Sequence, residues 1–342
     1  MALLREVHPG ELGLAGRTKP ARRQPPRTVR FDAREAWREG VKVEGVSRAL
    51  AQEGGVFFAN LQAPTRQELD ALAKEFSFHP LAIEDVLSRH QRPKIDVYAD
   101  HYFLVFYRIG MDSGEGVLIE EIDFFIGKNF LVVTHDSEIP FLDEVFERFR
   151  RSPGQKSVSR LLYEILDAIV DGYFPFLDEV AERSGEIEDA IFHDFATEDL
   201  EKVLDLKRDL AHLRRIVAPA RDTVNVLLRR DPPVIDAAEV FYFQDVYDHL
   251  VRVTDSIDTY RDLLGGSLDA FLSIQNNRLS EVVRRLTVIS VIFLPLTFLT
   301  GFFGMNFERT TGTGDAAFVA ALALMVAVPL GMYLFLRRKG LE

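Results

Sequence analysis

The residues best suited to chemistry in this sequence lie at the end of a long uncharged run. They are Gly304, Met305 and Asn306, and Glu308 follows two residues later. An amide oxygen is neutral and accepts hydrogen bonds, so it suits contact with the water shell of a cation. Mg²⁺ dehydrates reluctantly, and a pore for it should therefore accept the hydrated ion. A ring of Asn306 side chains would do this, with Gly304 freeing the backbone from the helix and Met305 packing beside the turn. An ordinary helix C-cap explains the glycine and asparagine as well, and both interpretations are compatible.

Charge and cysteine content narrow the classes of partner. The 342 residues carry 53 acidic and 41 basic side chains, for a net charge of −12, whereas a nucleic-acid partner favours a basic face. The chain has no cysteine, which excludes disulfides, thiolate metal sites and a cysteine nucleophile. Any metal site must therefore use oxygen or imidazole ligands, and oxygen suits hard cations.

Two uncharged runs near the C-terminal end, 286–306 and 316–336, each have about the 20 residues needed to cross a bilayer. A buried core helix is the alternative, but two such runs separated by nine residues favour a membrane hairpin. Basic residues flank the pair. By the positive-inside rule we expect both ends in the cytoplasm and a short external loop, on the evidence of Arg284, Arg285, Arg337, Arg338 and Lys339. The polar N-terminal segment is not expected to be a signal peptide.

Before these runs the chain mixes strands and helices. Apolar alternation predicts strands at 55–61, 97–109, 117–126 and 130–135, with a tight turn at 127–129. Helical spacing appears at 65–76, 81–90 and 140–151, and long helices follow over about 157–229. We therefore expect an α+β protein whose N-terminal part is an α/β sandwich around a meander-type sheet.

Acidic residues crowd one part of the predicted long helices. A solvated helix face is the simpler interpretation, and a fringe that concentrates cations is the alternative. The residues are Asp178, Glu179, Glu182, Glu186, Glu188, Asp189, Asp194, Glu198, Asp199 and Glu201.

A single helical pattern runs from about residue 241 into the first uncharged run. The section 245–285 would extend roughly 60 Å as a stalk at 1.5 Å per residue. Its apolar stripe is expected to need other copies of the chain for burial, and a two-span hairpin cannot enclose a water-filled path alone, so we expect a ring of identical subunits. The stripe consists of Leu250, Val253, Ile257, Tyr260, Leu264, Leu268, Phe271 and Ile274.

These patterns predict the following organisation. The segments are a flexible lead-in (1–29), a cytoplasmic α/β and helical domain (30–240), the stalk helix (241–285), the first, pore-lining span (286–304), the external loop (305–315), the second span (316–336) and a basic cytoplasmic tail (337–342).

Three segments together resemble the CorA family of divalent cation channels. They are "HPLAIEDVLSRHQRPK" at 79–94, "YDHL" at 247–250 and "IFLPLTFLTGFFGMNFE" at 292–308, which contains the Gly-Met-Asn motif. The resemblance covers the chain from about residue 45. It implies a funnel-shaped homopentamer in the cell membrane that admits Mg²⁺ passively, with Co²⁺ or Ni²⁺ as further candidates.

The resemblance also assigns residues. It places Asp269 in the pore and makes Asp85 and Asp245 a regulatory Mg²⁺ site between neighbouring cytoplasmic domains, although a helix-capping or surface role is the alternative for Asp85. Apolar rings at Val283, Leu286 and Leu294 are expected to close the path by dewetting. The other pore-lining candidates are Asn276, Ser280, Ser290, Thr297 and Gly301.

The chain departs from the usual CorA pattern at Ser280, Val283 and Leu294, and in the loop, where "RTTGTGD" follows Glu308 at the external mouth. This leaves a Zn²⁺ transporter of the ZntB-like branch as an alternative. A membrane-anchored sensor or enzyme is the competing class, but the sequence contains no HExxH, GxSxG or P-loop motif.

Overall fold

The computed structural model describes residues 26–31, 37–53, 55–89, 91–112, 116–153, 156–193, 197–229, 235–303 and 315–338. Over this part of the chain the fold is α+β, as predicted, and it divides into two compact units, Met1–Ser267 and Leu268–Glu342. The Gly304-Met305-Asn306 motif, Glu308 and Lys339 lie outside the described residues.

The first unit contains a seven-stranded sheet with the strand order β2-β1-β3-β7-β6-β5-β4. Every residue of β7 is buried, which explains why its sequence, "FLVVTH", is apolar almost throughout rather than alternating. The strands are β1 (Arg27–Phe31), β2 (Trp37–Glu39), β3 (Val56–Gln62), β4 (Lys94–Val97), β5 (Tyr102–Asp112), β6 (Gly116–Ile126) and β7 (Phe130–His135).

The predicted meander is confirmed only for β4 to β7, which pair antiparallel in chain order. Beyond them β3 joins β7 in parallel, and β1 and β2, which the sequence pattern did not predict, extend the sheet. The single strand predicted at 97–109 is wrong, because the chain turns between β4 and β5. The Tyr98 N–H donates to the His101 carbonyl at 2.9 Å and closes that turn.

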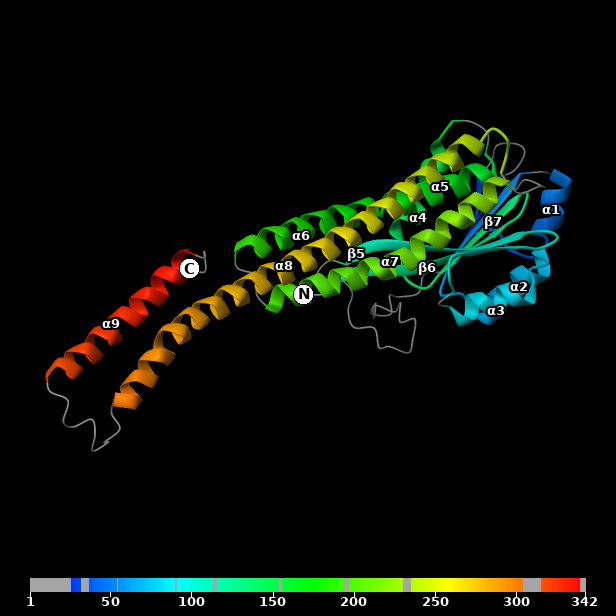
Figure 1. Ribbon diagram of the computed structural model, residues 1–342. Helices are drawn as coiled ribbons and strands as arrows, with labels where there is room; N and C mark the ends of the chain where they lie inside the picture. The colour runs from blue at the N-terminus through cyan, green and yellow to red at the C-terminus, as the bar shows by residue number, and fades with distance from the viewer. Residues whose placement is uncertain are drawn as a thin grey trace. The chain divides into compact units, whose positions relative to one another are not determined.

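Helices cover both faces of the sheet, as the predicted sandwich requires. Adjacent residues of β3 point to opposite faces: Phe57 stacks on Phe76 of α2 (Arg66–Phe76), whereas Phe58 stacks on Phe146 of α4 (Pro140–Arg151). Figure 1 shows α2 and α3 (Pro80–Ser88) on one side of the strands and α4 and α5 (Val158–Asp171) on the other. A short helix that was not predicted, α1 (Val46–Glu53), precedes β3.

Helix ends are set by local chemistry. Thr65 and Glu68 form a reciprocal capping box at the start of α2. His79 accepts a hydrogen bond from the Leu81 N–H, and Pro80 occupies the first turn of α3. That helix ends at Ser88, two residues before the predicted end, because Arg89 adopts a positive φ of 52°.

Three long helices, α5, α6 (Phe174–His193) and α7 (Thr197–Arg229), fill the predicted helical region. All three pack against β5, and the hydroxyl of Tyr173 donates to the Tyr107 carbonyl on that strand. The helical layer is thereby joined to the sheet through a buried contact.

The next helix, α8 (Val240–Phe303), is continuous over 64 residues, as the pattern predicted. Its apolar stripe was expected to need other subunits, and this is wrong for the part within the first unit. Leu250, Val253, Ile257 and Leu264 are all fully buried inside the single chain. Helix α7 lies beside this part of α8, and Arg214 donates to Asp258 at 2.7 Å between them.

The second unit contains the rest of α8 and α9 (Asp315–Arg338). Among the described residues, one helix is long and apolar enough to cross a membrane, over Val240–Phe302, and its apolar window is entirely unburied. Such an exposed apolar face requires a non-aqueous or protein partner.

We expect Gly127→Ala to lower the free energy of unfolding by about 1–3 kcal/mol through overpacking. A Cβ at this position in the β6–β7 turn would lie 2.1 Å from the ring of Phe130, which packs on Phe76. Gly185→Ala in α6 is the control, because its Cβ meets open space and alanine favours a helix. Denaturant unfolding of the two purified variants checks this, and equal stabilities would contradict it.

Candidate ion pathway and regulatory cation site

Asp85 lies in the last turns of α3 and is held within its own chain. Lys94 Nζ, at the start of β4, is 2.7 Å from Asp85 Oδ2 and 2.8 Å from Asp96 Oδ2. Asp85 does not cap α3, whose N-cap is His79. It is a partly buried carboxylate that already has one cationic partner.

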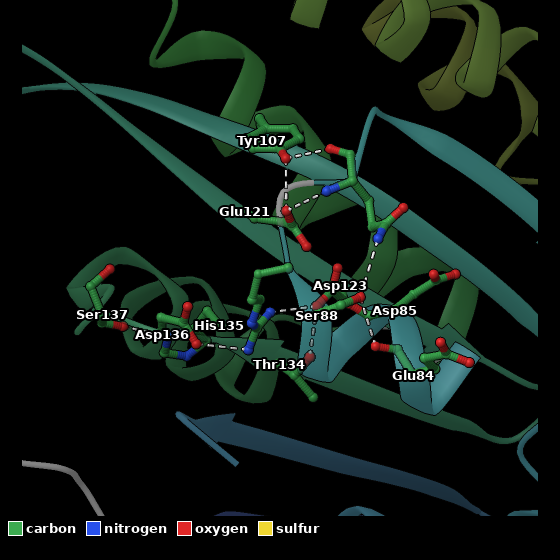
Figure 2. A network of polar contacts seen from close by, with 12 residues as sticks. Glu84, Asp85, Ser88, Tyr107, Glu121, Asp123, Thr134, His135, Asp136 and Ser137 are labelled. Atoms are coloured by element: carbon green, nitrogen blue, oxygen red, sulfur yellow. Dashed lines mark hydrogen bonds and ion pairs between the residues drawn. The ribbon is translucent and has the colours of Figure 1, made fainter. Parts of the chain in front are cut away.

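A buried polar network fixes the end of the helix that carries Asp85 (Figure 2). Arg89 pairs with Asp123 on β6 at 2.5 Å and with Asp136 at 2.9 Å, and Asp123 also accepts from the Thr134 hydroxyl at 3.1 Å. Burial raises the pKa of Asp123, while the charge of Arg89 opposes that shift. Removing either partner would leave a buried charge uncompensated, so this pair constrains the positive φ of Arg89 strongly.

The segment after α3 is held by a second set of contacts in the same view. The Tyr107 hydroxyl on β5 lies 2.7 Å from Glu121 on β6 and also contacts the Gln91 carbonyl, while the Gln91 N–H donates to Glu121 at 3.0 Å. The segment between α3 and β4 is thus tied to two strands. Asp85 and Lys94 sit at its two ends.

Asp245, near the start of α8, belongs to a different cluster. His249 lies one turn further on, with Nε2 3.7 Å from Asp245 and Nδ1 3.5 Å from Asp171 of α5. The ligand atoms of Asp167, Asp171 and His249 all lie within 4.8 Å of one another. Burial, followed by the charge of Asp171, raises the pKa of Asp167. Carboxylates and an imidazole at this spacing form a donor set that suits a divalent cation.

Within one chain, Asp85 and Asp245 have different partners, Lys94 for the first and His249 for the second. Exposed apolar side chains flank both acids: Leu81 is 58% exposed on α3, and Phe241 is 83% exposed on α8.

The predicted pore-lining residues all lie on α8, and each of them is exposed in the single chain. Leu294 is 75% exposed, and Val283 and Leu286 are also exposed. The Thr297 hydroxyl donates to the Phe293 carbonyl at 2.9 Å, so its own helix uses its proton and only its oxygen lone pairs remain for a ring. The remaining exposed members are Asp269, Asn276, Ser280, Ser290 and Gly301.

Ser280 and Val283 also line a hollow of about 440 Å³ within the second unit. Arg284 and Leu336 of α9 share it. Arg285 lies within α8 and pairs with Glu281 one turn earlier, whereas Arg337 and Arg338 end α9.

Four of the clustered acidic residues, Glu179, Glu182, Glu186 and Asp199, line a groove of about 520 Å³ on α6 and α7. Basic neighbours offset part of this charge, because Glu179 pairs with Arg183 and Asp205 pairs with Arg208. Both earlier interpretations, a solvated face and a fringe that concentrates cations, remain open for this groove.

Sequence reasoning missed Lys94, Asp167, Asp171 and His249. A signal was present for three of them: Asp167 and Asp171 are four residues apart, as are Asp245 and His249, and each pair therefore lies on one face of its helix. Only the packing of α5 beside α8 brings the two pairs together.

The chain matches known proteins over most of its length. YfjQ of Bacillus subtilis, whose name describes a metal ion transporter, is 34% identical over 83% of this chain and 89% of its own length. The cobalt/magnesium transport protein CorA of Thermotoga maritima is 34% identical over 77% of each chain. The solved CorA magnesium transporter of Methanocaldococcus jannaschii shares the fold, with a TM-score of 0.76 at 21% identity over 93% of this chain and 98% of its own.

The family described as CorA-like Mg²⁺ transporter protein matches residues 53–338, which include all the strands from β3 onward, α8 and α9. Its members are transporters and not enzymes. The α+β unit, the long helix with its apolar segment and this match together make the chain a member of the CorA family of metal ion transporters.

Proposed function

We propose that this protein is a homopentameric channel that admits Mg²⁺ into the cytoplasm and closes when cytoplasmic Mg²⁺ is high. Family membership supports divalent cation transport, and several relatives carry magnesium or cobalt in their names. A divalent ion gains about 4.6 kcal/mol on entry at −100 mV, twice the single-charge value, so passive influx needs no other energy source.

The observation that carries this proposal is the continuity of α8. One helix begins beside the Asp245 cluster and continues unbroken into the exposed apolar segment. A change in cation occupancy at its start would therefore act on the same continuous helix that lines the proposed pore. In this proposal residues 241–285 are the stalk and 286–304 the first span.

The second span is proposed at 316–336, within α9, surrounding the first. Both termini would then face the cytoplasm in the cell membrane, with the basic residues at the inner surface. Lipid would contact the outer helices. Gly304, Met305 and Asn306 would form the selectivity filter for the hydrated ion, and Glu308 would lie at the external mouth.

For regulation, we propose that Asp85 of one subunit and Asp245 of its neighbour share a divalent cation. Leu81 and Phe241, which are exposed in the single chain, lie one helical turn before these acids and would be buried with them between subunits. Asp167 and Asp171 would add carboxylate oxygens on the Asp245 side, with His249 in contact with Asp171 and Asp245. Without a divalent cation the two carboxylates would lose this bridge between subunits, so loss of Mg²⁺ would loosen the assembly and open the pore.

Flux measurement tests the transport proposal. The protein, reconstituted in liposomes that contain a Mg²⁺-sensitive dye and little internal Mg²⁺, is expected to admit external Mg²⁺, while protein-free liposomes do not. The same assay with Co²⁺, Ni²⁺ and Zn²⁺ ranks the ions and decides between a CorA-like and a ZntB-like selectivity. An assembled protein that passes none of these ions would favour a membrane-anchored sensor.

We expect Leu294→Asp to raise the resting leak of ions at high Mg²⁺ by at least about tenfold. The exposed leucine is proposed to close the path by dewetting, and a carboxylate would hydrate that constriction. A tenfold change in leak corresponds to about 1.4 kcal/mol. Leucine and aspartate differ by more than this in the free energy of transfer from water to the centre of a membrane helix. Flux from liposomes with millimolar Mg²⁺ on both sides measures the leak.

Leu294→Met is the control, because it conserves volume and apolar character and should keep the pathway closed. If the assembled aspartate variant leaks no more than the methionine variant, the constriction lies elsewhere on α8.

A further inference from the structure

Lys94 occupies the position that a regulatory cation would need beside Asp85. Its ammonium lies 2.7 Å from Asp85 and 2.8 Å from Asp96. All three side chains are partly exposed, so an ion from solution can reach the same carboxylates. The site proposed to bind a divalent cation therefore already holds a cation that belongs to the protein.

Lys94 carries its positive charge at physiological pH, as lysine side chains ordinarily do. Its ammonium is therefore present wherever magnesium regulation would operate.

The backbone positions of the pair are also fixed. Lys94 pairs with Val105 in the β4–β5 ladder, and Asp85 lies on the helix whose end is held by the Arg89–Asp123 ion pair. The two groups can separate only by rotation of their side chains. Replacement of Lys94 by another cation beside Asp85 therefore needs only side-chain movement and no change of fold.

We propose that Lys94 is an internal competitor that sets the Mg²⁺ concentration at which the channel closes. Without Mg²⁺ its ammonium neutralises Asp85, and a divalent cation must displace it or bind against its repulsion. This rests on the proposed role of Asp85 as a regulatory ligand. Lys94 is a positioning residue in this scheme, because it acts through Asp85 and touches no transported ion.

Removal of the charge should make the site more sensitive. We expect Lys94→Gln and Lys94→Met to lower the Mg²⁺ concentration for half-maximal protection from a protease by about three- to tenfold, the scale of a partly buried ion pair. Lys94→Arg should restore the midpoint to near the wild-type value, because it keeps the charge. Lys128→Gln, in the exposed β6–β7 turn, removes the same charge elsewhere and should not shift it.

The experiment is a Mg²⁺ titration of limited proteolysis on the full-length protein in liposomes. An unshifted midpoint in both neutral variants overturns the role of Lys94, and so does an equal shift in the arginine variant, because the effect would then be structural. If wild-type protein shows no Mg²⁺-dependent protection, the regulatory site itself fails and the role of Lys94 falls with it. The wild-type titration curve distinguishes failure of the regulatory site from failure of the Lys94 role, because only the first abolishes Mg²⁺-dependent protection of the wild-type protein.

Discussion

Asn306→Ala is expected to abolish Mg²⁺ uptake while the protein still assembles. The amide oxygens of Asn306 are proposed to accept hydrogen bonds from the water shell of the ion, and each such bond contributes about 0.5–1.5 kcal/mol. Loss of only two of them in a ring would lower the rate by roughly tenfold, and loss of all would remove measurable flux. Dye-loaded liposomes measure the uptake, and size-exclusion chromatography measures assembly.

Asn277→Ala provides the matched control. This asparagine is exposed on α8 but lies next to, and not on, the proposed pore face that carries Asn276. It should transport as the wild type does. Wild-type flux in an assembled Asn306→Ala protein would remove the filter from the Gly304-Met305-Asn306 motif, although the channel proposal itself would survive.

The second large effect is expected from Asp85→Lys combined with Asp245→Lys. Wild-type protein should be cut at least about tenfold faster in chelator than in millimolar Mg²⁺, because several intersubunit cations with 1–2 kcal/mol of coupling each act together. The double variant should be cut at the same rate in both conditions, since four oxygen ligands are replaced by ammonium groups. The milder pair Asp85→Asn and Asp245→Asn should give the same outcome without adding a charge beside Lys94.

A control with the same change in charge separates loss of the cation site from a general effect of charge on protection by Mg²⁺. Asp70→Lys with Asp262→Lys makes the same change in charge at exposed positions on α2 and α8. This control should keep its Mg²⁺-dependent protection. Equal cutting of the wild-type protein with and without Mg²⁺ would place regulation outside the Asp85 and Asp245 site.

The elements with strong local signals could be predicted from the sequence. The strands β3, β6 and β7 and the helices α2 and α4 lie within one residue of the predicted bounds, because apolar periodicity, the N-cap Thr65 and the first-turn proline Pro140 act over a few residues. The length of α8 was predicted for the same reason. Its uncharged segment identified the membrane candidate before any fold was known.

Pairing across long sequence distances could not be predicted in the same way. The parallel contact of β3 with β7 joins strands more than 60 residues apart, and β1 and β2 are short strands with little alternation. The burial of Leu250, Val253 and Ile257 also depends on which helix lies beside α8. A stripe of apolar residues predicts that a face is buried but does not predict which element covers it.

The candidate site divides in the same manner. The sequence by itself determined the type of ligand chemistry, with no cysteine and many acids, and it determined the motif and the acids Asp85 and Asp245 through their resemblance to the CorA family. Only the tertiary structure decided that Lys94 pairs with Asp85 and that His249 joins Asp167 and Asp171. These contacts are decided by side chains that meet across packed strands and helices, and their distances follow from the packing of elements that local sequence does not encode.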